Sequence, residues 1–212
     1  MTESEPGPRS LPEEVLMLPT GELSTGLAAA AALLMARAEA MGLVRVHDSD
    51  RFDTELLHQV LEAMSRSGIG RSVLDSDDLK RIPRDYFEIL NQSLEASPYP
   101  EGEWGSVLDV IDVSTVAELV GIEHESIQEF ASGNRTTPDA VALRLHFLAL
   151  ILADLLGSYN RYGIRRWFER PRKALGGVSP RQILDNGEWS PEDAGARRVA
   201  LLARSLRSLG AA

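Results

Sequence analysis

The stretch PDAVALRLHFLALILADLL, residues 138–156, decides the fold. It places apolar residues on almost every side of a helix, at Val141, Leu145, Leu148, Ile151, Leu152 and Leu155. A helix that is apolar all round is surrounded either by other protein or by lipid. Arg144, His146 and Asp154 interrupt the stretch, which argues against a membrane span. We therefore expect a central helix that other helices cover on several sides, or one that also contributes to a dimer interface.

The rest of the chain also has helical spacing of apolar residues, and sustained two-residue alternation is hard to find. We predict an all-α fold in which an N-terminal helical unit precedes a helix-turn-helix and a C-terminal helical domain. The segment 97–106, SPYPEGEWGS, is dense in proline and glycine and has no apolar period, so we place a boundary there. The expected organisation is a flexible tail at 1–20, a helical domain of unknown role at 21–97, the helix-turn-helix with the central helix at 106–158, and the C-terminal domain at 159–212.

Several helix starts are indicated by capping residues. The N-terminal helices are expected from about Ser24 to Met41, from Asp53 to Gly68 and from Asp85 to Ala96. Thr115 with Glu118, and Ser179 with Gln182, have the spacing of a capping box. Thr137–Pro138 and Ser190–Pro191 place a capping oxygen before a proline in the first helical turn. The last helix is expected over 194–209.

The composition excludes several classes of site. The chain of 212 residues has no cysteine, so disulfides, thiolate metal ligands and a cysteine nucleophile are ruled out. The acidic, proline-rich start is unlike a signal peptide, and the longest apolar stretch near it, residues 27–36, is too short to cross a bilayer. We expect a cytoplasmic protein with no membrane partner.

The charge is divided unevenly along the chain. Residues 1–159 carry 11 Lys and Arg against 27 Asp and Glu, a net charge of −16, whereas residues 160–212 carry 11 against 5, a net charge of +6. Two interpretations stay open: the two parts attract each other within the fold, or the basic end binds an acidic partner.

The stretch VSTVAELVGIEHESIQEFAS, residues 113–132, predicts a helix-turn-helix. Ala117 is small where two helices would cross, Gly121 stands where the chain must turn, and Ile127 and Phe130 lie under the second helix. If this unit binds operator DNA, Ser126 and Gln128 are the residues that would contact base edges and Arg135 the one that would contact a phosphate. The second helix is otherwise acidic, which favours the alternative of a structural or protein-binding helix pair.

No pattern of catalytic or metal-binding residues is present. The four histidines stand apart, and neither H-E-x-x-H nor G-x-S-x-G occurs. The glycines of SGIGRS follow a predicted helix and lack the strand of a dinucleotide site. We expect a protein that is not an enzyme and needs no cofactor and no metal.

The stretch RRWFERPRKALGGVSPRQIL, residues 165–184, combines arginines and a tryptophan with prolines and glycines that fix the path of the chain. It resembles the toxin-binding domain of the Xre/MbcA/ParS antitoxins, which has a tryptophan, a proline, a Leu-x-Gly turn, a second proline and a Leu-Leu-like pair in that order. The matching residues are Trp167, Pro171, Leu175 with Gly177, Pro180, and Ile183 with Leu184. The resemblance covers roughly residues 112–209, because these antitoxins also carry an Xre-like helix-turn-helix.

The resemblance implies that the protein is an antitoxin. Its partner would be a RES-type, NAD-consuming toxin, held inactive by the C-terminal domain, and operator DNA would be a second partner of a homodimer or higher oligomer. Trp167 and Phe168 are expected in the core rather than in the contact. The residues expected to contact the toxin are Arg165, Arg166, Arg170, Arg172, Lys173, Gly176, Gly177, Arg181, Arg204 and Arg207. The alternative function is a sequence-specific transcriptional regulator without a toxin partner.

Overall fold

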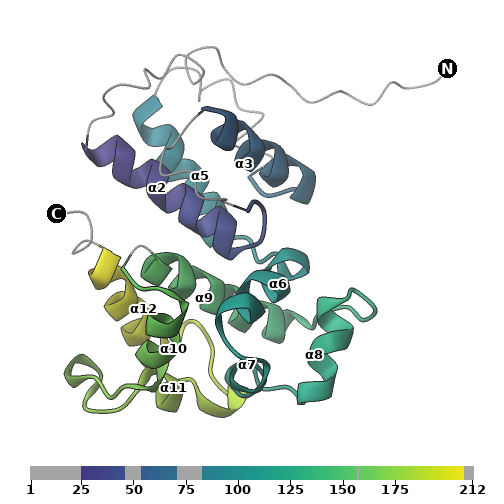
Figure 1. The fold of residues 1–212 in the computed structure, drawn as a ribbon, viewed down its shortest axis with the longest axis vertical. Helices are drawn as coiled ribbons and strands as arrows, with labels where there is room; N and C mark the ends of the chain where they lie inside the picture. The colour runs from purple at the N-terminus through teal and green to yellow at the C-terminus, as the bar shows by residue number, and fades with distance from the viewer. Residues whose placement is uncertain (1–24, 46–53, 71–82, 157, 208–212) are drawn as a thin grey trace.

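The computed structural model describes residues 25–45, 54–70, 83–156 and 158–207, and within these ranges the chain is all-α, as predicted, without a strand. An N-terminal unit of three helices lies above the other helices in Figure 1. Its helices are α2 (Thr25–Ala40), α3 (Thr54–Ser67) and α5 (Pro83–Glu95). The lower region contains α6 (Pro100–Val110), α7 (Val113–Val120), α8 (His124–Ala131), α9 (Asp139–Leu156), α10 (Arg161–Glu169), η2 (Lys173–Leu175), α11 (Pro180–Ile183), η3 (Asp185–Gly187) and α12 (Ala194–Arg207).

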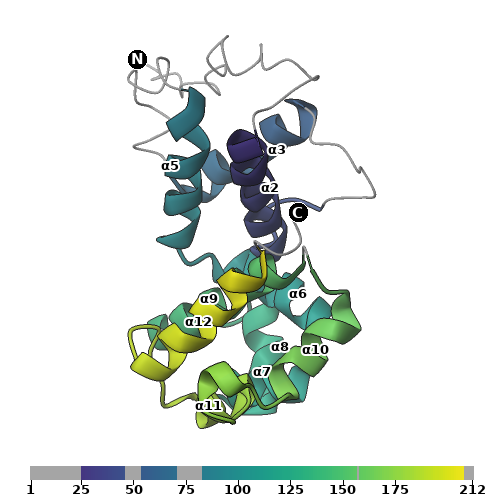
Figure 2. The ribbon, with the colours of Figure 1, turned by 90° about the vertical axis from the view of Figure 1, so that its left-hand side faces the viewer.

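Helix α9 is the centre of the fold, as its sequence predicts. It packs against α2, α6 and α12, and α12 runs beside it in Figure 2. Leu145, Leu148 and Leu155 are fully buried, whereas Leu143 is the one large apolar residue of α9 that is exposed. The covering layers are contributed by helices of this same chain.

Helix α2 joins the N-terminal unit to the rest of the protein. It packs against α5 on one side and against α9 on the other, and so lies between two hydrophobic clusters. Ala31, Leu34 and Ala38 are buried, and the small alanine side chains of this helix allow neighbouring helices to approach it closely.

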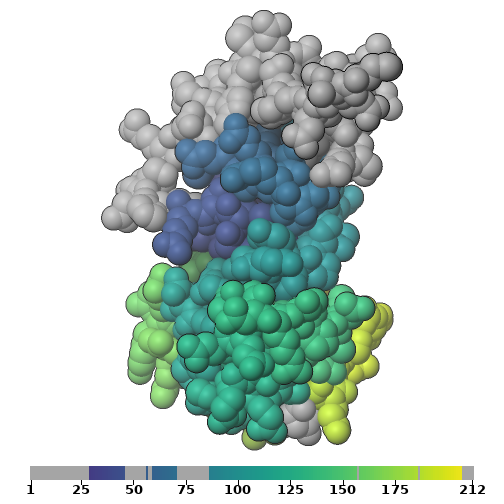
Figure 3. All heavy atoms as spheres, turned by 90° about the vertical axis from the view of Figure 1, so that its right-hand side faces the viewer, coloured from purple at the N-terminus to yellow at the C-terminus, as the bar shows by residue number. Residues whose placement is uncertain are grey.

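Only the first part of the segment 97–106 is irregular: residues 97–99 connect α5 to α6, and the rest of the segment is helical. Helix α6 begins there, at Pro100, and Trp104 is fully buried. The proline occupies the first helical position, where its missing N–H costs nothing. Gly102 is needed for close packing, because a Cβ at this position would lie 2.4 Å from the carbonyl oxygen of Met41. In Figure 3 the teal atoms of α6 accordingly lie between the purple atoms of the N-terminal unit and the green atoms of α8.

The capping predictions had mixed outcomes. The capping box of Ser179 and Gln182 is confirmed, with Ser179 N–H donating to Gln182 Oε1 at 2.9 Å. The box at Thr115 is wrong: Asp112 caps α7 instead, because its carboxylate lies one turn earlier and accepts from the Thr115 backbone N–H at 2.9 Å. The prediction at Ser190–Pro191 is also wrong, since α12 begins only at Ala194 and the Ser190 N–H donates to Asp193 at 2.8 Å.

The predicted turn between α7 and α8 is formed by Gly121, whose φ of +75° lies in the left-handed region that favours glycine. The η3 segment packs on this turn so closely that a Cβ on Gly187 would lie 2.1 Å from the Gly121 Cα. Trp189 Nε1 donates to the Leu119 carbonyl at 2.8 Å, and Arg144 donates to the Val120 carbonyl at 3.0 Å. The end of α7 is thereby joined to the C-terminal region.

The predicted tail at 1–20 and the predicted cap residues Ser24 and Asp53 lie outside the described residues. Within the described ranges, no single helix is long and apolar enough to span a membrane. Helices α9 and α10 reach the length and apolar composition of a membrane span only when they are taken together, and the pair is bent by 119°.

Gly102→Ala is predicted to destabilise the protein by about 2 kcal/mol, because the added methyl group overlaps the Met41 backbone and α2 must move. The matched control is Gly105→Ala in the same helix, where no atom lies within 4 Å of the added carbon. That variant should gain about 0.5–1 kcal/mol from helix propensity. Urea unfolding measures both; equal effects of the two substitutions would contradict the close contact of α2 with α6.

Candidate partner-binding surface

Helix α10 divides sharply into a buried side and an exposed side. Asn160 caps it by accepting from the Gly163 N–H at 2.8 Å, which fixes where the helix begins. Ile164, Trp167 and Phe168 are buried, and the two aromatic rings meet edge to face with centroids 5.2 Å apart. The prediction that Trp167 and Phe168 belong to the core is confirmed. The opposite side of the helix carries Arg165 and Arg166, and Arg170 is the C-cap residue that follows the helix.

The chain after α10 closes into a short loop. Pro171 follows the helix, and Arg172 N–H donates to the Val178 carbonyl while Gly177 N–H donates back to the Arg172 carbonyl, both at 2.9 Å. Leu175 is buried beneath the loop and anchors it. Gly176 and Gly177, at φ +80° and +87°, are both exposed, and no atom lies within 4 Å of where their Cβ atoms would be. The loop needs these glycines for their backbone conformation and not for close packing.

Four basic side chains of this region are exposed and make no ion pair or hydrogen bond with any described residue: Arg165, Arg166, Arg170 and Lys173. We call these four residues the cationic face. Tyr162 lies one helical turn before Arg165 and Arg166 and is 65% exposed. Arginine beside exposed tyrosine is the composition enriched in the central residues of protein interfaces.

Arg181 belongs to the scaffold of this surface. It pairs with Glu169 at 2.6 Å and also with Glu118, so it ties α11 to both α10 and α7. The hydrogen bonds that Arg181 donates to the carboxylates of Glu169 and Glu118 raise the pKa of Arg181 above its usual value. The structure therefore places this predicted contact residue in an ion-pair cluster at the surface, where it binds other residues of the chain.

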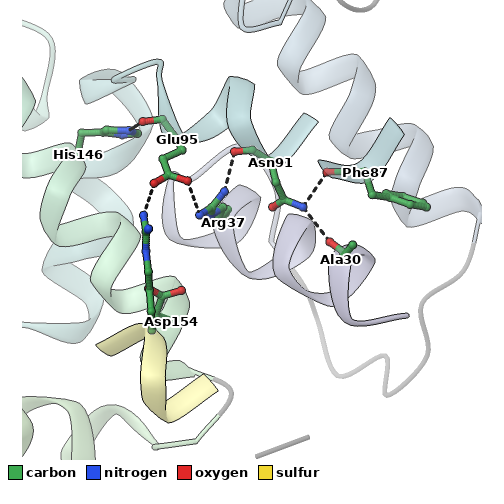
Figure 4. A network of polar contacts seen from close by, with 8 residues as sticks. Ala30, Arg37, Phe87, Asn91, Glu95, His146 and Asp154 are labelled. Carbon is green, nitrogen blue, oxygen red and sulfur yellow. Dashed lines mark hydrogen bonds and ion pairs between the residues drawn. The ribbon is translucent and has the colours of Figure 1, made fainter. Parts of the chain in front are cut away.

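Arg204 also lies away from the cationic face. It pairs with Glu95 of the N-terminal unit and lies 3.9 Å from Asp154 of α9. Glu95 also pairs with Arg37 of α2, whose Nη2 lies 2.9 Å from the second carboxylate oxygen, so the carboxylate lies between two cations. Figure 4 shows the pair of Arg37 and Glu95. The contact of Arg204 with Glu95 joins the acidic and basic parts of the chain within the fold. The side chain of Arg207 lies outside the described residues.

The same junction contains a buried histidine that its sequence context did not reveal. His146 Nδ1 lies 2.6 Å from Glu103 Oε1, and its Nε2 lies 3.0 Å from the Glu95 carbonyl oxygen. Glu103 is fully buried, and burial raises its pKa although His146 opposes the shift. The pair fixes α6 and α9 against the end of α5.

The surface predicted to bind DNA has a different character. Gln128 is exposed and Ser126 half-buried on α8, but Glu123, Glu125 and Glu129 share the exposed surface of this helix. Arg135 pairs with Glu129 at 3.3 Å and lies over the Phe130 ring, 4.8 Å from its centroid. In Figure 1, α8 and α10 lie on opposite sides of the lower region. The predicted DNA-contacting and partner-contacting residues thus form two separate surfaces.

The described residues contain no group of three or more His, Asp or Glu side chains placed to hold a metal ion. Comparison of the chain with family models, curated proteins and solved structures finds no match.

Glu95→Gln is predicted to destabilise the protein at neutral pH by about 2 kcal/mol, because it removes the carboxylate between Arg37 and Arg204. The loss is smaller than for a fully buried pair, since Glu95 is 37% exposed and solvent screens it. Burial opposes the shift, but the two arginines lower the pKa of Glu95 below its usual 4.5. Its stabilising contribution is therefore present above about pH 4.5 and is lost as the pH falls through the lower folded pKa.

Urea unfolding of both proteins between pH 7 and pH 3 measures this effect. The difference in unfolding free energy should shrink as the solution is acidified. The control is Glu129→Gln, which removes an exposed carboxylate from Arg135 and should change stability by less than about 0.5 kcal/mol. A difference for Glu95→Gln that is independent of pH would contradict the charge-based account.

Proposed function

We propose that this protein is a non-enzymatic, antitoxin-like binding protein that neutralises a partner toxin through a docking module. The module is formed by α10, the loop of residues 171–178, which we call the glycine loop, and α11. The resemblance to Xre/MbcA/ParS antitoxins suggests a RES-type, NAD-consuming toxin. The observation that carries the proposal is the cationic face: four exposed cations without a described partner, on a chain whose net charge is −10. An acidic protein gains nothing in stability from leaving such a cluster unpaired, so an external partner is its simplest use.

The rigidity of the module supports the same function. The cations of α10 are carried by a helix whose other side is buried through Trp167 and Phe168. The Arg181 cluster and the closed loop hold the remaining path of the chain. A surface that is ordered before binding loses less conformational entropy when the complex forms.

In this proposal the toxin presents carboxylates around the entrance to its NAD site. Arg165, Arg166 and Arg170 would pair with them at the edge of the interface, where charges mainly accelerate and orient association. Tyr162 would supply apolar contact near the centre. Neutralisation follows from occlusion of the entrance, with no chemical step by this chain.

The charge-reversed double variant Arg165→Glu, Arg166→Glu is predicted to lose toxin binding by at least about tenfold and to stop rescuing growth when the toxin is co-expressed. The first toxin to test is a RES-type protein encoded beside the gene of this chain. Co-purification and calorimetry give binding, and NAD consumption by the toxin gives neutralisation.

The chain offers a matched control in Arg197 and Arg198, an adjacent exposed arginine pair on α12. Arg197→Glu, Arg198→Glu changes the net charge by the same amount and should leave binding intact. An equal loss of toxin binding in both double variants would show that the effect comes from the change in net charge alone. Full neutralisation by Arg165→Glu, Arg166→Glu would refute the docking assignment.

Operator binding through Ser126, Gln128 and Arg135 remains a secondary hypothesis that rests on the family resemblance. The acidic surface of α8 opposes it, because glutamates next to the groove repel phosphates. Retention of specific DNA by the folded protein at low salt, lost by Gln128→Ala, would support it.

A further inference from the structure

We propose that Trp167 and Arg172 form a receptor for one carboxylate of an acidic protein partner, with the indole Nε1–H and the guanidinium Nε–H as its two donors. The inference rests on the proposed function in one respect, that α10 and the glycine loop face a partner. It adds a specific chemical group to be recognised and the two atoms that recognise it.

The first observation is a contrast among the three tryptophans. Trp104 Nε1 donates to Thr137 Oγ1 at 2.9 Å, and Trp189 Nε1 donates to the Leu119 carbonyl at 2.8 Å. The Nε1 of Trp167 is buried and has no hydrogen-bond partner among the described residues, although the residue is only 1% exposed. A buried indole N–H normally finds an acceptor. The contrast suggests that the acceptor for Trp167 comes from outside the chain.

The second observation concerns Arg172, which lies beside this tryptophan. Its Cζ is 5.7 Å from the centroid of the Trp167 ring, and its Nε is likewise buried without a partner in the described structure. The guanidinium makes no ion pair with any described residue, so only stacking holds it over the ring. Two unpaired donors thus belong to side chains in direct contact, and one of them is permanently charged.

The surroundings allow an acceptor to approach. The backbone of Arg172 is fixed by its bonds to Val178 and Gly177, so the side chain can turn while the loop stays closed. Space is open above Gly176 and Gly177, where a side chain would otherwise project. In this proposal the guanidinium rotates off the indole as the acceptor enters and remains as the second donor.

The charge around the donors selects a carboxylate. Arg170 and Lys173 flank Arg172 in sequence, and both are exposed. Hydrogen bonds from a cation to a carboxylate are roughly twice as strong as those between neutral groups. A phosphate of nucleic acid is disfavoured, because the net charge of −10 repels a polyanion much longer than this patch. The occupant is therefore an Asp or Glu side chain of a protein.

Nuclear magnetic resonance of the ¹⁵N-labelled protein tests this directly, because each indole N–H gives its own signal. The probe is a synthetic octaglutamate peptide, titrated at constant ionic strength, and the Trp167→Phe spectrum identifies the Trp167 signal by its absence. We expect the Trp167 proton to move downfield, while the Trp104 and Trp189 signals stay fixed as internal controls. An unmoved Trp167 signal, or equal shifts of all three, would overturn the proposal. An unmoved Trp167 signal is the result expected if a buried water, and not a carboxylate, accepts from the Trp167 indole N–H.

Arg172→Lys separates this specific role from general charge, because lysine keeps the positive charge but lacks the Nε donor. Peptide affinity should fall by at least about tenfold. The control is Arg135→Lys, an arginine that also lies over an aromatic ring but sits near α8, and it should bind the peptide normally. Unchanged affinity in Arg172→Lys would refute the role of Nε; the signals of Trp104 and Trp189 report that each variant is folded.

The outcomes are distinguishable from those of the toxin assay. If the peptide shifts Trp167 but no toxin is bound, the carboxylate receptor stands and the toxin assignment fails. If the toxin is neutralised with Arg172→Lys as well as with the wild type, and the peptide leaves Trp167 unmoved, the receptor fails while the proposed function stands.

Discussion

The burial of α9 on almost all sides is the constraint on which the rest of the structure depends. An amphipathic helix needs one neighbouring layer, but the apolar residues of α9 point in every direction and each exposed leucine would cost about 1.5–3 kcal/mol. Three helices from distant parts of the chain, α2, α6 and α12, supply the cover. The N-terminal unit is consequently packed on the lower region through α2, and the two hydrophobic clusters adjoin along that helix.

Polar groups on the central helix then determine how those layers align. His146 and Asp154 are buried with α9, and a buried polar group without partners is costly. Glu103 and the Glu95 carbonyl contact His146, while Arg204 approaches Asp154 and pairs with Glu95. Apolar packing alone tolerates sliding between helices, whereas these contacts fit only one alignment of α5, α6, α9 and α12. Through Glu95 and Asp154 they also neutralise Arg204, a cation of residues 160–212, within the fold.

Sequence patterns predicted the elements better than the contacts between them. The apolar pattern of α9, the glycine turn at Gly121 and the Ser179 box each depend on residues within one or two helical turns, and such local signals can be read from a single chain. The composition of α6 does not predict a helix, because its glycines are typical of loops, although Gly102 serves close packing against Met41, 61 positions away. The pairing of Arg204 with Glu95 spans 109 positions and leaves no periodic trace. Sequence alone could not show which of the ten predicted contact residues form ion pairs within the chain and which face solvent without a described partner.

That separation has a physical consequence for recognition by the C-terminal region. Arg181 joins α11 to α10 and α7, and Arg204 joins α12 to the N-terminal unit, so neither side chain can bind a partner without losing these contacts. The cationic face has the opposite property: its side chains have no described internal partner, so no contact within the fold has to break when a ligand arrives. Arg172 lies between these two cases. Its backbone is fixed in the loop, whereas its guanidinium contacts only the Trp167 ring in the described structure. Its Nε–H has no acceptor among the described residues. A fixed backbone with a free side chain combines low ordering cost with the ability to adjust, which is the property expected of the residue that first contacts an incoming carboxylate.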